Sequence, residues 1–195
     1  MKELIHLQNI TDLHKLFNIG NSYHPLVTVL DFSKVTEQVE QNSKITTDFY
    51  SIMFKNYCKN NIKYGRKAID FQDGNLICIA PNQTIEIDYE VEEREDKMGW
   101  GLFFHPDLIR STILNDKIKS YSFFHYEVSE ALHLSDKEKN ILFECIQKIQ
   151  IELQENIDVH SQYIIVTTIE LLLTARRSIT YCIILEASVK KAGNF

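Results

Sequence analysis

The chain has 195 residues, 44% of them hydrophobic and 25% charged, which is typical of a globular protein with one continuous core. The formal net charge of -6 argues against direct binding to nucleic acid, because a stand-alone nucleic-acid binder carries a basic surface. Polar residues interrupt the first sixteen positions and no later segment reaches membrane-spanning length. We therefore expect a cytoplasmic protein that does not associate with membranes.

The first two-thirds of the chain alternates short apolar segments with turn signals. Strands are expected at 26–32, 46–55, 76–79, 84–88 and 99–104. Turns are expected at Tyr64-Gly65-Arg66, Gln72-Asp73-Gly74-Asn75 and Ala80-Pro81-Asn82, where glycine, proline and asparagine gather. Short strands at this spacing favour a sandwich or barrel over a parallel sheet with helical crossovers.

Aromatic residues are abundant, with 11 Phe, 9 Tyr and one Trp, and a small barrel lined by them is able to enclose one ligand. If the polar residues of each strand face outward, seven residues face inward and form the expected ligand-binding set: Tyr50, Ile52, Phe54, Ile85, Ile87, Trp100 and Leu102. Trp100 stands between two glycines, which would let its ring lie against a neighbouring backbone or line a cavity. The alternative is that these residues pack as a core without a cavity.

A run of charge occupies residues 86–97, with five acidic residues close together: Glu90, Glu92, Glu93, Glu95 and Asp96. Because like charges repel and avoid burial, the first interpretation is a solvated hairpin loop. A site for a divalent ion or a basic partner is the second interpretation.

The pattern changes after Phe124. Ser135 and Glu138 form a capping box that starts a long helix, and a second helix is expected from about His160, after a polar turn at 156–158. Two helices joined by a short turn must be antiparallel. Each carries more apolar surface than one contact hides, so they pack onto the barrel or face a second subunit in a homodimer. The expected dimer-interface residues are Leu142, Cys145, Ile149, Ile165, Ile169 and Leu172.

Motifs that carry chemistry are missing from the sequence. The seven histidines, at 6, 14, 24, 105, 125, 133 and 160, are isolated, so neither a metal site nor another cofactor is expected. There is no Gly-x-Ser-x-Gly, no phosphate-binding glycine loop, and no activated cysteine. The cysteines, at 58, 78, 145 and 182, are expected to be packed thiols. We expect no catalytic residues and no enzyme activity.

Four segments together resemble one family. These are Asp48–Lys55, Phe71–Pro81, Met98–Arg110 with its "FHPDLI", and Tyr121–Ser135 with its "EALHLS". They resemble the ligand-binding N-terminal domain of AraC-family transcription regulators over residues 20–175. The resemblance implies a cupin-like barrel of the jelly-roll type that senses a small-molecule effector, followed by a helical hairpin through which two subunits associate.

In that family, a C-terminal module with two helix-turn-helix units reads DNA, and nothing in this chain matches that module. The expected organisation is a barrel with an N-terminal arm at 1–130, a dimerising hairpin at 131–180 and a divergent tail at 181–195. DNA binding is expected only through the missing module. Cupin enzymes depend on clustered histidines and a glutamate, which are absent here. The alternative function is a metal-independent or degenerate cupin enzyme that acts on a small metabolite.

Overall fold

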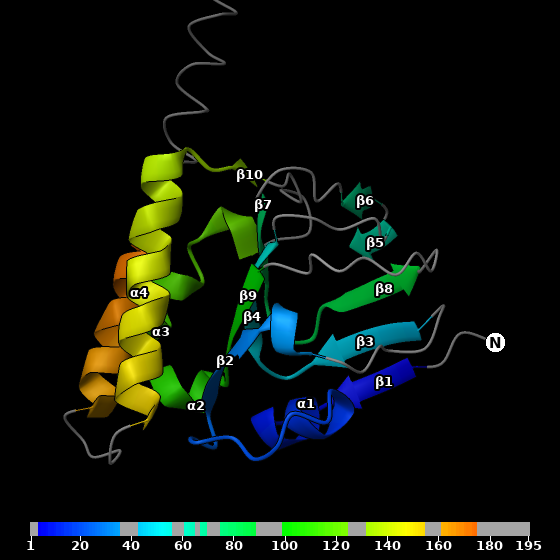
Figure 1. Cartoon of the computed structure of the whole chain (residues 1–195), viewed down its shortest axis with the longest axis horizontal. Helices are drawn as coiled ribbons and strands as arrows, with labels where there is room; N and C mark the ends of the chain where they lie inside the picture. Colours follow the sequence, from blue (N-terminus) through cyan, green and yellow to red (C-terminus); the bar gives the residue numbers. More distant parts are fainter. Residues whose placement is uncertain are drawn as a thin grey trace, which may run out of the picture. The chain divides into compact units, whose positions relative to one another are not determined.

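The computed structural model describes residues 4–35, 43–55, 61–64, 67–69, 75–88, 99–124, 132–154 and 161–174. The chain divides into two compact units, Met1–Leu134 and Ser135–Phe195. The first unit contains all of the described strands, and the second contains two helices (Figure 1). The charged run beyond Asp88, the predicted turns at 65–66, 72–74 and 156–158, and the tail at 181–195 lie outside the described residues.

Five strands form the first sheet, in the order β1-β3-β8-β5-β6. Their bounds are Leu4–Leu7 for β1, Ser43–Thr47 for β3, Thr84–Asp88 for β8, Asn61–Tyr64 for β5 and Lys67–Ile69 for β6. The β1–β3 pairing is parallel and the other three pairings are antiparallel. A strand from the N-terminus therefore completes one edge of this sheet.

Five further strands form the second sheet, in the order β10-β7-β4-β9-β2, and every pairing in it is antiparallel. Their bounds are Leu132–His133 for β10, Asn75–Ile79 for β7, Tyr50–Lys55 for β4, Gly99–Phe104 for β9 and Val27–Asp31 for β2. The central strands β4 and β9 pair over their whole length, from Tyr50 opposite Phe104 to Lys55 opposite Gly99.

One hydrophobic core joins the two sheets. Ile45 of the first sheet belongs to the same buried cluster as Met53, Ile77 and Phe103 of the second. The hydrogen-bonded ladders end at β1 and β6 in one sheet and at β10 and β2 in the other, so the described strands form two separate sheets. The expectation of a closed barrel is not met in the described residues, although a β-rich unit followed by helices is present.

Four of the five predicted strands are confirmed and one is corrected, whereas β1, β5, β6 and β10 were not predicted. β2, β7, β8 and β9 lie where the sequence places strands, but the segment expected as one strand at 46–55 is divided into β3 and β4. The chain bends at Asp48 and Phe49, where the Asp48 N–H donates to the carbonyl of Leu7 and the Thr47 hydroxyl donates to the carbonyl of Phe49. Such a bend is not visible in the amino-acid composition, because the residues on both sides of it are typical of strands.

The N-terminal segment contains structure that sequence analysis did not predict. α1 (Ile10–Leu16) begins at a capping box, in which the Asn9 side chain accepts the N–H of Asp12 while the Asp12 carboxylate accepts the N–H groups of Gln8 and Asn9. Ile10 and Leu13 are buried in the inter-sheet cluster. The expected arm is therefore an integral strand and helix of the first unit.

The motif "FHPDLI" covers the end of β9 and the start of a helix. The His105 ring accepts the N–H of Asp107, which caps α2 (Pro106–Ile109), and Pro106 occupies the first helical turn. α3 (Ile113–Ile118) and the short helix η2 (Ser122–Phe124) follow. Leu108, Leu114, Ile118 and Phe123 of this segment are buried.

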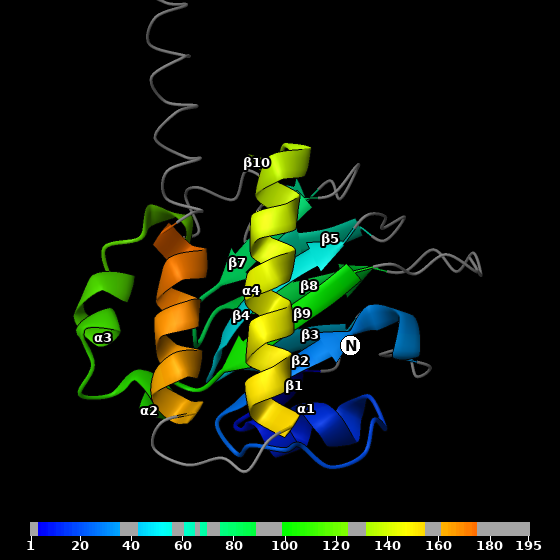
Figure 2. The same ribbon diagram turned by 60° about the vertical axis from the view of Figure 1, so that its left-hand side comes forward.

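The described residues of the second unit form two helices. α4 (Asp136–Gln154) begins as predicted, because the Ser135 hydroxyl accepts the Glu138 N–H while the Glu138 carboxylate accepts the Ser135 N–H at 2.7 Å. The next helix covers 161–174. Figures 1 and 2 show the two helices side by side, running in opposite directions, as the short connection predicts. Within the described residues, neither of these nor any other helix is long and apolar enough to span a membrane.

Candidate functional site

Five of the seven residues predicted to bind a ligand lie together on one face of the second sheet. In the β4–β9 register, Tyr50 is opposite Phe104, Ile52 is opposite Leu102 and Phe54 is opposite Trp100. Directly opposite residues of an antiparallel pair share a face. This face is apolar and closed, since Ile52 and Leu102 are 0% exposed.

Aromatic contacts fill this face. The Phe54 and Trp100 rings stack with centroids 5.9 Å apart, and the Tyr50 ring stacks on Phe104 at 5.0 Å. Phe124 of η2 meets the edge of Tyr50 at 5.1 Å, so part of the 106–124 segment packs here. Burial raises the pKa of the Tyr50 phenol. These contacts pack the rings against one another, and ligand binding by these residues stays a prediction.

The sequence predicted that these residues face inward, and five of them lie on the face of the second sheet away from the inter-sheet core. The inter-sheet core uses the opposite face of β4 and β9, through Met53 and Phe103, and this cluster contains neither Ile52 nor Leu102. Ile85 of β8 does pack against that cluster, and Ile87 lies two residues along the same strand. The polar-outward assumption fails because the second sheet is buried on both faces: Ser51, on the Met53 face, is only 4% exposed.

The glycine at 101 makes room for aromatic rings of the inter-sheet core. A Cβ atom built on Gly101 would lie 2.5 Å from the Cε2 atom of Phe103 and 2.8 Å from the Cζ atom of Phe32. Real carbon atoms do not approach so closely, so both rings occupy the space that a side chain at 101 would need. The lack of a side chain at Gly101 therefore leaves room for the Phe103 and Phe32 rings, and Trp100 points to the other face of the sheet.

All six residues expected at the dimer interface are buried within the single chain. Leu142, Ile149, Ile165, Ile169 and Leu172 are at most 1% exposed, and Cys145 is 5% exposed. Burial, followed by the negative charge of Glu144, raises the pKa of the Cys145 thiol. Four other apolar residues of the two helices are exposed by half or more: Phe143, Ile151, Tyr163 and Leu171.

His6, His14, His24 and His105 have hydrogen-bond partners in the described part of the chain. The His6 ring contacts the Asp48 carboxylate at 2.7 Å, joining β1 to the bend after β3. The His24 ring accepts the N–H of Leu26, and burial lowers the pKa of His24. Within the described residues, no three His, Cys, Asp or Glu side chains are placed to hold a metal ion. Cys78 and Cys145 are buried and form no disulfide bond, whereas Cys58 and Cys182 lie outside the described residues.

A hollow of about 480 Å³ lies between α1 and the loop that follows it, in the first unit. Residues from one side of α1 and from the loop line it: Thr11, His14, Lys15, Asn18, Gly20, Asn21, Ser22 and Pro25. Asn18 and Gly20 adopt positive φ angles of 49° and 76°, which turn the loop back along the helix. Sequence analysis did not identify this hollow; the turn-forming run Asn18–Ser22 was its available signal.

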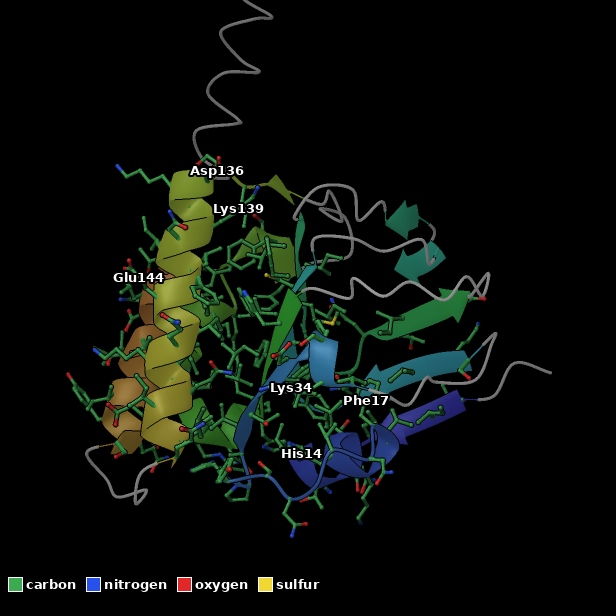
Figure 3. All side chains as sticks on the ribbon, in the orientation of Figure 1. His14, Phe17, Lys34, Asp136, Lys139 and Glu144 are labelled. Atoms are coloured by element: carbon green, nitrogen blue, oxygen red, sulfur yellow. The ribbon has the colours of Figure 1, made fainter. Side chains whose placement is uncertain are left out.

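His14 of α1 (Figure 3) is one of the residues that line the hollow, and it is only 7% exposed. Its Nδ1 atom lies 2.9 Å from the Gly20 carbonyl oxygen, and its Nε2 atom lies 2.9 Å from the Thr28 hydroxyl. A carbonyl only accepts, so Nδ1 carries the proton and Nε2 accepts from Thr28. This ring therefore connects the loop to β2.

A scan against protein-family models found no match to the chain, and a search of curated proteins found none either.

Proposed function

We propose that the chain is the effector-sensing and dimerising part of an AraC-type transcription regulator, which controls a DNA-binding module attached to it. The observation that carries the proposal is the order of its units. A ten-strand β unit is followed directly by an antiparallel helix pair that begins at the Ser135–Glu138 capping box. The motif residues around His105 and Ser135 act as helix caps, which explains why these short phrases occur where they do.

The exposed side of α4 supports association with a second copy. Phe143 and Ile151 are 51% and 57% exposed and stand four residues before and after Gln147. In an antiparallel pair of α4 helices centred on Gln147, Phe143 of each copy would lie beside Ile151 of the other. The same residues of each copy would form this contact, so the surface is complementary to itself in shape.

Light scattering of the purified chain tests the dimer. We expect a dimer dissociation constant between about 1 µM and about 100 µM, which is typical of a modest interface. Phe143→Glu should give monomers of unchanged helical content, because the side chain is exposed within one chain. Ile113→Glu is the matched control, since Ile113 is an exposed isoleucine (70%) of the first unit and its replacement should leave the dimer intact.

Sensing is tested by a thermal-shift screen of small metabolites on the same protein. An effector should raise the melting temperature and change the dimer dissociation constant, since coupling requires different ligand affinities in the two states. A monomer at the highest concentration contradicts the dimerising role. A ligand that binds with the same affinity to wild type and Phe143→Glu contradicts the coupling.

A further inference from the structure

The hollow beside α1 has the chemistry of an anion site. Among the residues that line it, Lys15 is charged and none is acidic, within a protein whose net charge is -6. The carboxylate nearest in sequence, Asp12, already accepts two backbone N–H groups at the start of α1. The ammonium group of Lys15 therefore has no carboxylate in the hollow to neutralise it.

Hydrogen-bond donors of the hollow are available. Within the described part of the chain, the side chains of Thr11 and Asn21 make no hydrogen bond, and Gly20 uses its carbonyl, which accepts from His14, while its N–H makes none. Together with Lys15, these groups give backbone N–H, amide, hydroxyl and ammonium donors around one space. Oxyanions are bound by such convergent N–H groups and a cation.

Acceptors that would repel an anion are already occupied. The last carbonyls of α1 carry the negative end of the helix dipole. Here the Leu13 carbonyl accepts the N–H of Phe17, the His14 carbonyl accepts that of Ile19, and the Lys15 carbonyl accepts that of Asn18. The Ser22 hydroxyl donates to the carbonyl of His24 at 2.6 Å.

We propose that this hollow binds the oxyanion group of a small metabolite, either a carboxylate or a phosphate. Lys15 supplies the charge, and Gly20, Asn21 and Thr11 supply hydrogen bonds. A volume of about 480 Å³ is in the range of small-molecule sites and exceeds the volume of a bare ion, so the ligand carries further atoms. The open side of the hollow leaves these atoms near solvent.

The proposal goes beyond the proposed function, because it holds whether or not the chain regulates transcription. If the chain is a transcription sensor whose effector binds elsewhere, the hollow can still bind an anion. Conversely, anion binding here without any effect on dimerisation would support the site and count against the coupling described above.

The test is a two-dimensional ¹H–¹⁵N NMR titration of the whole chain with inorganic phosphate and, separately, with succinate, each up to about 20 mM at constant ionic strength. Chloride at the same ionic strength is the blank. We expect saturable shifts of the Gly20 and Asn21 amides with at least one probe. Lys15→Gln should weaken binding at least tenfold, which is about 1.4 kcal/mol. Lys34→Gln is the matched control, because Lys34 is an exposed lysine on η1 (Phe32–Lys34) outside the hollow (Figure 3).

Saturation by phosphate alone identifies a phosphate site, and saturation by succinate alone identifies a carboxylate site. Shifts that do not saturate, that chloride reproduces, or that fall outside residues 11–25 overturn the proposal. So does equal binding by Lys15→Gln and wild type. The spectrum of each variant reports its folding in the same experiment, so a loss of binding through unfolding is recognised directly.

Discussion

Gly101→Ala is expected to destabilise the β unit through two aromatic rings. The new methyl group would lie 2.5 Å from the Cε2 atom and 2.8 Å from the Cζ atom of Phe103, and 2.8 Å from the Cζ atom of Phe32. Phe103 is 5% exposed in the core cluster and Phe32 packs against that cluster, so the rings have little space to move into. Gly101 does not have a positive φ angle, so the backbone accepts alanine and the cost is steric.

The magnitude follows from two opposing effects. Overpacking of a closed core costs about 1–3 kcal/mol. Replacing glycine by alanine at an allowed φ angle gains about 0.4–1 kcal/mol, because it restricts the unfolded chain. We therefore expect a net loss of about 1–2 kcal/mol in the free energy of unfolding. Phe103→Leu removes the ring atoms in conflict, so in a double-mutant cycle it should reduce the cost of Gly101→Ala.

Urea unfolding followed by Trp100 fluorescence measures these free energies, because Trp100 is the one tryptophan and is buried. Gly20→Ala is the contrasting variant: no atom lies within 4 Å of its Cβ position, but its φ angle of 76° disfavours alanine by about 1 kcal/mol. That cost should be unaffected by Phe103→Leu. The reasoning is refuted if Gly101→Ala is as stable as wild type, or if its cost is independent of Phe103.

Three further predictions concern single side chains. Burial lowers the pKa of His24 below its usual value of 6.5, so the contribution of His24 to stability is complete above pH 6.5 and is lost as the pH falls from there toward the folded-state pKa. Melting temperatures measured between about pH 7.5 and about pH 5.5 should show a fall that His24→Gln reduces. Thr28→Val leaves the buried Nε2 atom of His14 without a donor and should cost about 1–3 kcal/mol in urea unfolding, whereas Thr28→Ser should cost less. Ser135→Ala removes the cap of α4 and should lower stability by about 1 kcal/mol, with Ser135→Asp retaining most of it.

Elements with strong local signals were predictable from the sequence. The Ser135–Glu138 capping box marks the start of α4, and turn residues around Pro81 mark the end of β7 and the start of β8. The bend at Asp48 was not predictable, since its partner is the Leu7 carbonyl of β1, far away in sequence. The parallel β1–β3 pairing is equally non-local, and so the N-terminal segment was interpreted as an arm.

The site was predicted less well, for a physical reason. Alternation reveals the inside of a strand only when one face meets water. On β4, Ile52 is 0% exposed and its neighbours Ser51 and Met53, on the opposite face, are 4% and 7% exposed. Ser51 is polar but buried, so the rule that polar residues face solvent exchanges the two faces of β4. The sequence still placed Ile52, Leu102 and Trp100 on one shared face, because sharing a face depends on strand register alone.

Residues around His14 connect the hollow to the centre of the β unit. The Gly20 carbonyl and the Thr28 hydroxyl are joined through one imidazole ring, and Thr28 pairs with Phe103 in the β2–β9 ladder. Phe103 in turn occupies the space above Gly101 in the inter-sheet core. A change in the loop at Gly20 must therefore either break a hydrogen bond of a buried ring or move β2. Because closely packed cores have discrete arrangements, the second route would transmit a local change to both sheets.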